Sequence, residues 1–178
     1  LPSRVSRWKG HDLLITYFAL IDQKYKNLFK IHLISSNQSK EEKKINKLVK
    51  ELGLSKNVVI TKPTLKINKL YHDSFLVVNL SKRPEGFGRT ISEALSSAKP
   101  IIAPNQGGTK EQLYHFDKKL LFNVNSYSSF LRAFEYVIKN YQLISKKGRK
   151  FVKKNYSSDL MCKKTLEVYN YLVNQWTF

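Results

Sequence analysis

The chain has 178 residues, 42% of them apolar, which is enough for one domain with a hydrophobic core. Every apolar run is shorter than the roughly 18 residues that a membrane-spanning helix needs, which argues against a transmembrane protein. The single cysteine, Cys162, cannot form an internal disulfide and fits a reducing, cytoplasmic compartment. The four histidines are scattered without the spacing of metal ligands, so no metal site is expected.

The chain is strongly basic, with 32 lysines and arginines against 13 aspartates and glutamates and a formal charge of +19. Such an excess points to two classes of partner, nucleic acid and anionic membrane surfaces. A codon bias that favours Lys, Asn, Ile, Tyr and Phe, all abundant here, would explain the basic excess without any binding partner. Most of the lysines are therefore expected on solvated helix faces. Residues 139–154 are a partial exception and form a candidate contact for anionic lipid headgroups, worth about 1 kcal/mol per basic residue near the surface. The basic residues of this segment are Lys139, Lys146, Lys147, Arg149, Lys150, Lys153 and Lys154.

Five apolar runs have the length and β-branched content of strands buried in a parallel sheet. They lie at residues 29–35, 57–61, 74–80, 100–104 and 120–124. Residues 1–5 have the pattern of a further strand whose beginning is missing. Because the chain begins at Leu1 and its one methionine is Met161, we expect it to be a fragment or a processed piece.

The segments between these runs have the periodicity of helices. The first helix follows Gly10 and has an apolar stripe of Leu13, Leu14, Tyr17, Phe18 and Ile21. Ser39 and Glu42 form a capping-box pattern at the start of a second helix, which ends at Gly53. A short helix is expected around Leu70 and Tyr71.

Three helices are expected after the last strand, within residues 126–176. The first has Phe130, Leu131, Phe134 and Ile138 facing inward, and the second covers 142–154. The third begins at Ser158, and its apolar stripe predicts packing in the core or between domains. Strands that alternate with helices predict one doubly wound, Rossmann-like parallel sheet, whose ligands bind beyond the carboxyl ends of the strands.

The most informative stretch runs from Arg83 to Glu111 and reads strand, glycine turn, helix. In the turn, Glu85-Gly86-Phe87-Gly88, two glycines allow positive φ or a close approach to a ligand. The helix predicted over 90–98 begins with unpaired N–H groups and the positive end of its macrodipole, which favours an anion such as phosphate. Arg89 adds a positive charge.

Two carboxylates complete this constellation. Glu85 lies in the turn, and Glu93 follows eight residues later, about one turn inside the helix. A carboxylate would repel phosphate, whereas it accepts two hydrogen bonds from vicinal hydroxyls. The pattern therefore predicts a site for a phosphorylated, hydroxyl-rich ligand, and the less favoured alternative is a structural glycine turn with two solvated glutamates.

The spacing of these residues resembles the donor-sugar half of family 4 retaining glycosyltransferases of the GT-B fold. The likeness rests on Glu-Gly-Phe-Gly, Glu93-Ala94, the run 99–103 and the pair Gly107-Gly108 with Glu111, and is specific because all of these occur within thirty residues. It implies that residues 1–178, with C-terminal helices over 126–176, form the C-terminal nucleotide-sugar domain. The N-terminal acceptor domain of such enzymes would be absent.

The resemblance also assigns roles to particular residues. Arg4 and Lys9 would bind the donor diphosphate, although Ser3 replaces the glycine that usually precedes this arginine. Glu93 would hold the ribose hydroxyls, and Glu85 the hydroxyls of the donor sugar. The remaining implied contacts are Thr64 near the base, the amides of Gly86 and Phe87 at the sugar, and Gly88, Arg89 and Thr90 at the diphosphate.

The implied reaction is metal-independent transfer of a sugar, with retention, from a nucleotide sugar to a saccharide or a lipid-linked acceptor. No cofactor is expected, and the isolated domain is expected to be inactive because acceptor groups belong to the missing half. UDP, GDP and ADP donors remain open, and attachment to the inner membrane surface is a further expectation. Two alternatives are a non-catalytic donor-binding subunit of a split transferase and a basic nucleic-acid-binding Rossmann domain. The second is less favoured because the chain contains no recognised nucleic-acid-binding module.

Overall fold

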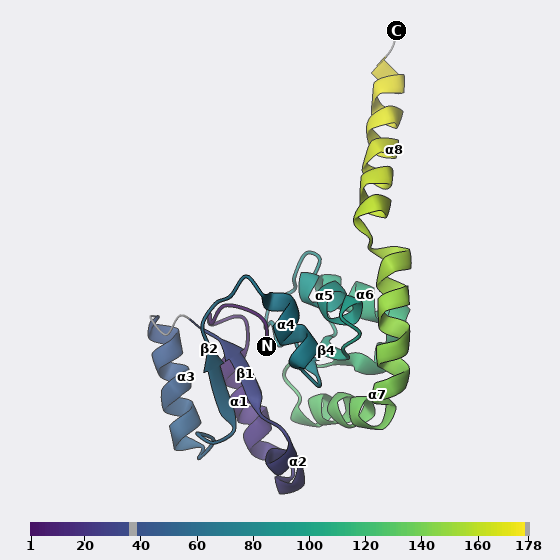
Figure 1. The fold of residues 1–178 in the computed structure, drawn as a ribbon. Coiled ribbons are helices and arrows are strands. Elements are labelled where there is room, and N and C mark those ends of the chain that lie inside the picture. The colour runs from purple at the N-terminus through teal and green to yellow at the C-terminus, as the bar shows by residue number, and fades with distance from the viewer. Residues whose placement is uncertain (36–38, 177–178) are drawn as a thin grey trace.

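The computed structural model describes residues 1–35 and 39–176 and shows an α/β domain from which one helix projects (Figure 1). The strands are β1 (Ile31–Ile34), β2 (Val58–Thr61), β3 (Val77–Val78), β4 (Ile101–Pro104) and β5 (Leu121–Phe122). The helices are α1 (His11–Leu20), α2 (Gln23–Leu28), α3 (Lys40–Glu51), α4 (Ile67–Asp73), α5 (Arg89–Ser96), α6 (Gly107–Asp117), α7 (Tyr127–Asn155) and α8 (Ser158–Trp176). A 3₁₀ turn, η1 (Lys118–Leu120), precedes β5.

All strand pairs are parallel, as predicted, but the strands form two separate sheets. One sheet has the order β1-β2, in the register Ile31 opposite Val58. The other has the order β3-β4-β5, with Val77 opposite Ile101 and Ala103 opposite Leu121. The prediction of one continuous sheet is therefore wrong for the described residues. The predicted places of the five strands between residues 29 and 124 are confirmed, whereas the strand expected at residues 1–5 is not formed in the described structure.

The core lies around β4, in which all four residues are buried. Helices α5 and α6 pack against this strand, and α7 packs against α5 and β5. Leucine, isoleucine and phenylalanine side chains from these elements, from the end of β3 and from η1 fill the space between strand and helix layers. The fully buried members are Leu80, Ile91, Leu95, Ile101, Ile102, Leu113, Leu120 and Phe122.

Local signals in the sequence fix several helix ends. Ser39 Oγ accepts from the Glu42 N–H at 3.1 Å, and the Glu42 carboxylate accepts from the Ser39 N–H at 2.8 Å, which confirms the capping box. Helix α2 was not predicted, although Asp22 caps it through a 2.8 Å bond from the Lys24 N–H. This helix has six residues, too few for periodicity to reveal it.

Helix α7 combines the two helices expected between residues 126 and 154. Asn140 marks the junction with non-helical angles, φ −122° and ψ 17°. Its Nδ2 donates to the Tyr136 carbonyl oxygen at 2.9 Å, and such side-chain bonding to the preceding turn competes with helix geometry. The expected break is therefore a kink within one element.

Helix α8 projects away from the domain (Figure 1), and none of its side chains is buried in the part of the helix whose burial is described. The expectation that its apolar stripe packs in the core of this domain is wrong, because Leu166, Tyr169 and Val173 are exposed. The cause is that no other element of the described structure lies alongside it. No described helix is both long and apolar enough to cross a membrane.

Candidate functional site

The glycine turn of residues 85–88 lies against the start of α6. The Gly108 N–H donates to the Glu85 carbonyl oxygen at 2.8 Å. A Cβ added to Gly108 would lie 2.5 Å from the carbonyl oxygens of Gly86 and Phe87, so only glycine lets the two loops approach this closely. Gly88 has φ 76°, which turns the chain directly into α5.

The carboxylate of Glu85 is held by three side chains from two parts of the chain. Lys9 Nζ forms an ion pair with Oε1, Ser81 Oγ donates to the same oxygen, and Asn79 Nδ2 lies 3.3 Å from Oε2. Burial disfavours the charged form, but the bonds from Lys9 and Ser81, with the charge of Lys9, outweigh it and lower the pKa of Glu85. The carboxylate is therefore ionised at neutral pH.

Asn79 joins the end of β3 to the start of α5. Its Nδ2 donates to Thr90 Oγ1 at 3.0 Å, and its Oδ1 accepts from the Ser81 N–H at 2.9 Å. Asn79 and Ser81 are both buried. This amide sets the position of Thr90 relative to Glu85, a role that the sequence did not reveal although a polar residue ending an apolar strand was a usable signal.

Lys9 reaches Glu85 because the segment before α1 lies directly on the end of β3. The Lys82 N–H donates to the Trp8 carbonyl oxygen at 2.7 Å. Gly10 has φ 71°, and a Cβ there would lie 2.2 Å from the Leu80 carbonyl oxygen. Lys9 Nζ also lies 4.1 Å from the centre of the Trp8 ring, a cation–π contact.

The second carboxylate, Glu93, is held between α4 and the first turn of α5. Tyr71 donates from its hydroxyl to Glu93 Oε2 at 2.6 Å, and Arg89 Nη2 lies 3.3 Å from Oε1. Burial, together with the bond and charge of Glu93, raises the pKa of Tyr71 far above its ordinary value, so the phenol stays a donor. The Arg89 side chain is 85% exposed, so a ligand can reach it although it is paired with Glu93.

Gln112 of α6 fixes the carbonyl groups of the glycine turn and was not predicted. Its Nε2 donates to the Phe87 carbonyl oxygen and lies 3.3 Å from that of Gly88, while its Oε1 accepts from Ser92 Oγ at 2.6 Å. The side chain is 2% exposed. Gln112 therefore fixes the orientation of the two peptide groups just before α5.

The remaining predicted residues have looser surroundings. Arg4 is exposed, and Thr64 is exposed with Oγ1 accepting from the Lys66 N–H at 3.1 Å. Phe87 is half exposed, and its ring meets the edge of Tyr156 at 5.6 Å. The structure thus brings together Lys9, Glu85 and the start of α5, and records no contact of Arg4 or Thr64 with them.

The arrangement combines the carboxyl groups of Glu85 and Glu93, the basic side chains of Lys9 and Arg89, and a helix N-terminus. Carboxylates accept from hydroxyls, and the helix start with Lys9 and Arg89 favours anions. Among residues 1–35 and 39–176, no group of three His, Cys, Asp or Glu side chains is placed to hold a metal ion.

Comparison with solved structures shows a shared fold. The glycosyltransferase of Rickettsia africae ESF-5 matches 97% of this chain and 46% of its own, at 27% identity and a TM-score of 0.82. A TarM mutant of S. aureus, in complex with fondaparinux, α-GlcNAc-glycerol and UDP, matches 94% of this chain and 34% of its own. Its sequence identity is 27% and its TM-score is 0.75. Anabaena HepE with UDP-glucose matches 95% of this chain and 47% of its own, at 23% identity and a TM-score of 0.83. The chain therefore spans less than half the length of these three proteins.

This likeness confirms the predicted fold class, the Rossmann-like C-terminal domain of the GT-B glycosyltransferases. Among proteins with curated descriptions, none matches the chain. The model of the glycosyl transferases group 1 matches residues 2–158, most of the chain, and the chain therefore belongs to this family.

Proposed function

We propose that residues 1–178 are the donor domain of a retaining, metal-independent glycosyltransferase and bind a nucleoside diphosphate sugar. The observation that carries this proposal is the pair of held carboxylates at the start of α5, Glu85 fixed by Lys9 and Glu93 fixed by Tyr71. Glu85 suits the hydroxyls of the sugar and Glu93 those of the ribose, and the N-terminus of α5 suits the diphosphate that joins them. The UDP in the TarM complex and the UDP-glucose in the HepE complex support a nucleotide-sugar ligand.

The proposed roles follow from the chemistry of each group. Glu93 accepts hydrogen bonds from the ribose hydroxyls, and Glu85, with the amides of Gly86 and Phe87, from those of the sugar. Lys9, Arg4, Arg89 and the amides of residues 88–90 stabilise the negative charge that grows on the diphosphate as the sugar leaves. These cations take the part that a metal plays elsewhere, and Thr64 lies beside the base.

The transfer itself would need a second domain that carries the acceptor site, since the related structures are more than twice as long as this chain. The proposed acceptor is a saccharide or a lipid-linked saccharide. On this proposal the 178-residue chain alone binds the donor but transfers sugar poorly.

Thermal unfolding with UDP, GDP and ADP tests donor binding directly. A ligand at about 100 times its Kd stabilises the native state by roughly 2.7 kcal/mol, so one nucleotide should raise Tm by several degrees. In Glu93→Gln this rise should fall sharply, because a charged acceptor contributes about 1.5–3 kcal/mol and its loss weakens binding roughly tenfold to a hundredfold. Gln still accepts from Tyr71, so the fold is preserved.

Glu167→Gln on the projecting helix α8 is the matched control and should leave the shift unchanged. Repeating the measurement with EDTA and with Mg²⁺ tests metal independence. A shift that is equal in both variants, or no shift with any of the three nucleotides, would contradict the donor-site assignment.

A further inference from the structure

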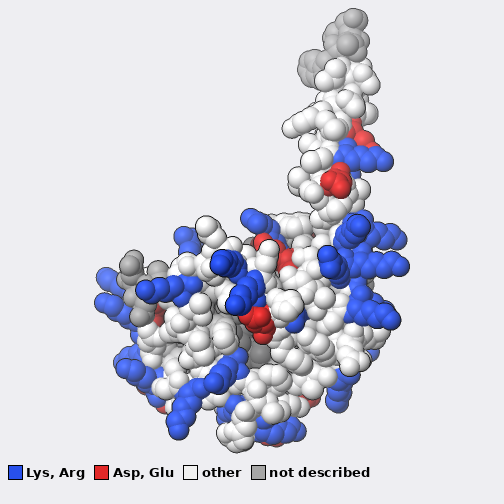
Figure 2. All heavy atoms as spheres, viewed as in Figure 1, with Lys and Arg blue, Asp and Glu red and all other residues white. Residues whose placement is uncertain are grey.

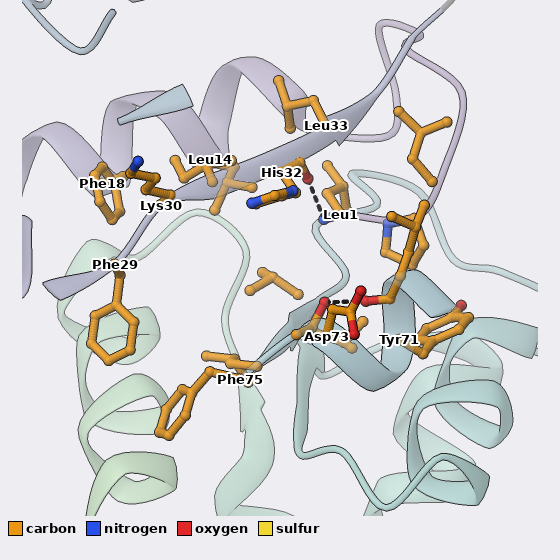
Figure 3. Close-up of a pocket in the computed structure, with 18 of the residues that line it drawn as sticks. Leu1, Leu14, Phe18, Phe29, Lys30, His32, Leu33, Tyr71, Asp73 and Phe75 are labelled. Carbon is orange, nitrogen blue, oxygen red and sulfur yellow. Dashed lines mark hydrogen bonds between the residues drawn. The ribbon is translucent and has the colours of Figure 1, made fainter. Parts of the chain in front are cut away.

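Asn79 lies where the chain passes from the apolar core into the candidate site. The two residues before it, Val77 and Val78, line an apolar cavity of about 460 Å³ between the two sheets (Figure 3). Asn79 itself does not line this cavity and is only 3% exposed. A buried amide destabilises a protein unless its donors and its acceptor find partners, so the partners of Asn79 indicate its role.

The amide of Asn79 has one orientation that satisfies its neighbours. Its Oδ1 accepts from the Ser81 N–H at 2.9 Å, while its Nδ2 donates to Thr90 Oγ1 at 3.0 Å and lies 3.3 Å from Glu85 Oε2. In the reversed orientation, Nδ2 would face the Ser81 N–H and Oδ1 would face the Glu85 carboxylate. Both of these contacts are repulsive, so one N–H hydrogen is directed to Thr90 and the other to Glu85.

The Thr90 hydroxyl is thereby left to donate. A hydroxyl group can donate one hydrogen bond and accept two. Because the Thr90 oxygen already accepts from Asn79, its hydrogen is directed elsewhere, and residues 1–35 and 39–176 supply no recorded acceptor for it. Thr90 is the second residue of α5, so this hydrogen joins the unpaired N–H groups at the start of that helix.

Glu85 receives the second N–H of Asn79 and has the opposite character. Its carboxylate is ionised and can only accept hydrogen bonds. A single buried amide therefore contacts a donor at the start of α5 and an acceptor in the glycine turn. These are the groups that the proposed function pairs with the diphosphate and with the sugar hydroxyls.

We propose that Asn79 is a specificity-determining residue that fixes the hydrogen-bond polarity of the donor site, so that Thr90 offers a ligand only a donor and Glu85 only an acceptor. This role depends on the proposed binding of a nucleotide sugar, because an ionised diphosphate has acceptors alone and matches the donors at the start of α5. A neutral hydroxyl group placed there would find no acceptor for its own hydrogen. Since Asn79 acts through Thr90 and Glu85, it is a positioning residue.

The test is a double-substitution cycle in the 178-residue chain, measured by calorimetric titration with whichever of UDP, GDP and ADP raises Tm most. Thr90→Val should weaken binding about tenfold, because one hydrogen bond to a charged group is lost. Asn79→Leu should weaken it about fivefold, since the Thr90 hydroxyl can then turn to Glu85, which has lost a donor too. In the Thr90→Val chain, Asn79→Leu should weaken binding by less than about twofold further, because the group through which it acts is gone.

Two further variants separate this role from a structural one. Thr90→Ser keeps the hydroxyl and should retain affinity within about threefold. Asn79→Asp keeps the acceptor for the Ser81 N–H but has no donor, so it should weaken binding at least as much as Asn79→Leu and serves if that variant does not fold.

Asn57→Leu is the matched control for loss of an amide. Its Nδ2 donates to the Lys26 carbonyl oxygen at 2.7 Å, before the start of β2, so the variant should be less stable to urea but bind nucleotide normally. Independent losses in the cycle, no loss in Thr90→Val, or an equal loss in Asn57→Leu would overturn the role of Asn79 and leave the donor site standing. No binding of any of the three nucleotides by the unsubstituted chain would overturn both.

Discussion

At the scale of single residues, the site is built from pairs in which one side chain fixes another. Lys9 and Glu85 are 76 residues apart in sequence, and Tyr71 and Glu93 are 22 apart. Each carboxylate that we assign to substrate hydroxyls is thereby held in one orientation before any ligand arrives. Preorganisation of this kind reduces the entropy lost on binding.

Removing the Tyr71 hydroxyl tests how much the fixed orientation of Glu93 contributes to nucleotide affinity. We expect Tyr71→Phe to weaken binding of the preferred nucleoside diphosphate about threefold to tenfold, because one hydrogen bond that orients Glu93 is lost while the ring still fills its pocket. Calorimetric titration measures the change. Tyr136→Phe on α7 is the matched control, since Tyr136 donates to Asp117 at 2.7 Å in the same way. Equal loss of affinity in both variants would show that Tyr71 acts only through stability.

His11 predicts a pH dependence of stability. Its side chain is 1% exposed, and burial lowers the pKa of His11 to about 4. Between pH 6.5 and 4 this histidine is protonated in the unfolded chain but neutral in the folded chain. The free energy of unfolding therefore decreases as pH falls through this range, by up to about 3 kcal/mol. Urea unfolding at pH 7 and pH 4.5 measures this loss.

The control for this prediction is His11→Gln, which does not titrate and can still donate to the Ser3 carbonyl oxygen that lies 3.2 Å from His11 Nε2. Its stability should fall less over the same range. Glu85 adds a loss only at lower pH, because its pKa is itself lowered. Parallel curves for the two chains would refute the assignment to His11.

At the scale of elements, the residue that follows the end of α5 has a strained backbone conformation. Ala98 has φ 55°, the left-handed region, and the Lys99 N–H donates to the Ala94 carbonyl oxygen at 2.9 Å, as in a Schellman motif. Glycine is the residue that suits this position. The positive φ of Ala98 is therefore a strained conformation for a residue that has a Cβ.

We expect Ala98→Gly to raise the free energy of unfolding by about 0.5–1 kcal/mol, because relief of left-handed strain exceeds the added entropy of the unfolded chain. Urea unfolding measures it. Ala133→Gly, at a buried position inside α7, is the control and should destabilise. A loss of stability in Ala98→Gly would mean that the Cβ of Ala98 makes packing contacts worth more than the strain.

Elements differ in how well the sequence predicts them, for physical reasons. The strands and the capping box at Ser39 were predicted because their signals are local. The kink at Asn140 depends on a side-chain bond, and the separation of the sheets depends on which strands meet. The contacts around Glu85 were predicted only in part. The pairing with Lys9 and the bonds of Gln112 join segments that are distant in sequence, and the bond from Asn79, six residues away, depends on how the loop after β3 folds back.

At the scale of the whole molecule, basic side chains far outnumber acidic ones. Lysines and arginines stand out over much of the face in Figure 2, including the part formed by α7. The formal charge is +19, so the chain is expected to attract any polyanion. Such attraction involves counterion release and depends steeply on salt, unlike recognition of a specific ligand.

We therefore expect binding to a short DNA duplex to weaken by about three orders of magnitude between 50 and 200 mM salt. Fluorescence anisotropy measures this change. Nucleotide binding, which involves fewer charges, should weaken much less over the same range. DNA binding that persists at 200 mM with nanomolar affinity would favour the nucleic-acid alternative over the donor site.

The ion pair between Lys9 and Glu85 has a consequence for the order of events in a catalytic cycle. An intact nucleotide sugar offers the lysine a phosphate and the carboxylate two hydroxyls, so both groups gain partners when their mutual bond opens. A spent nucleotide offers a partner to the lysine alone. The re-forming of Lys9–Glu85 then competes with the product, so on the proposed roles the resting protein itself favours release of the leaving group and rebinding of fresh donor.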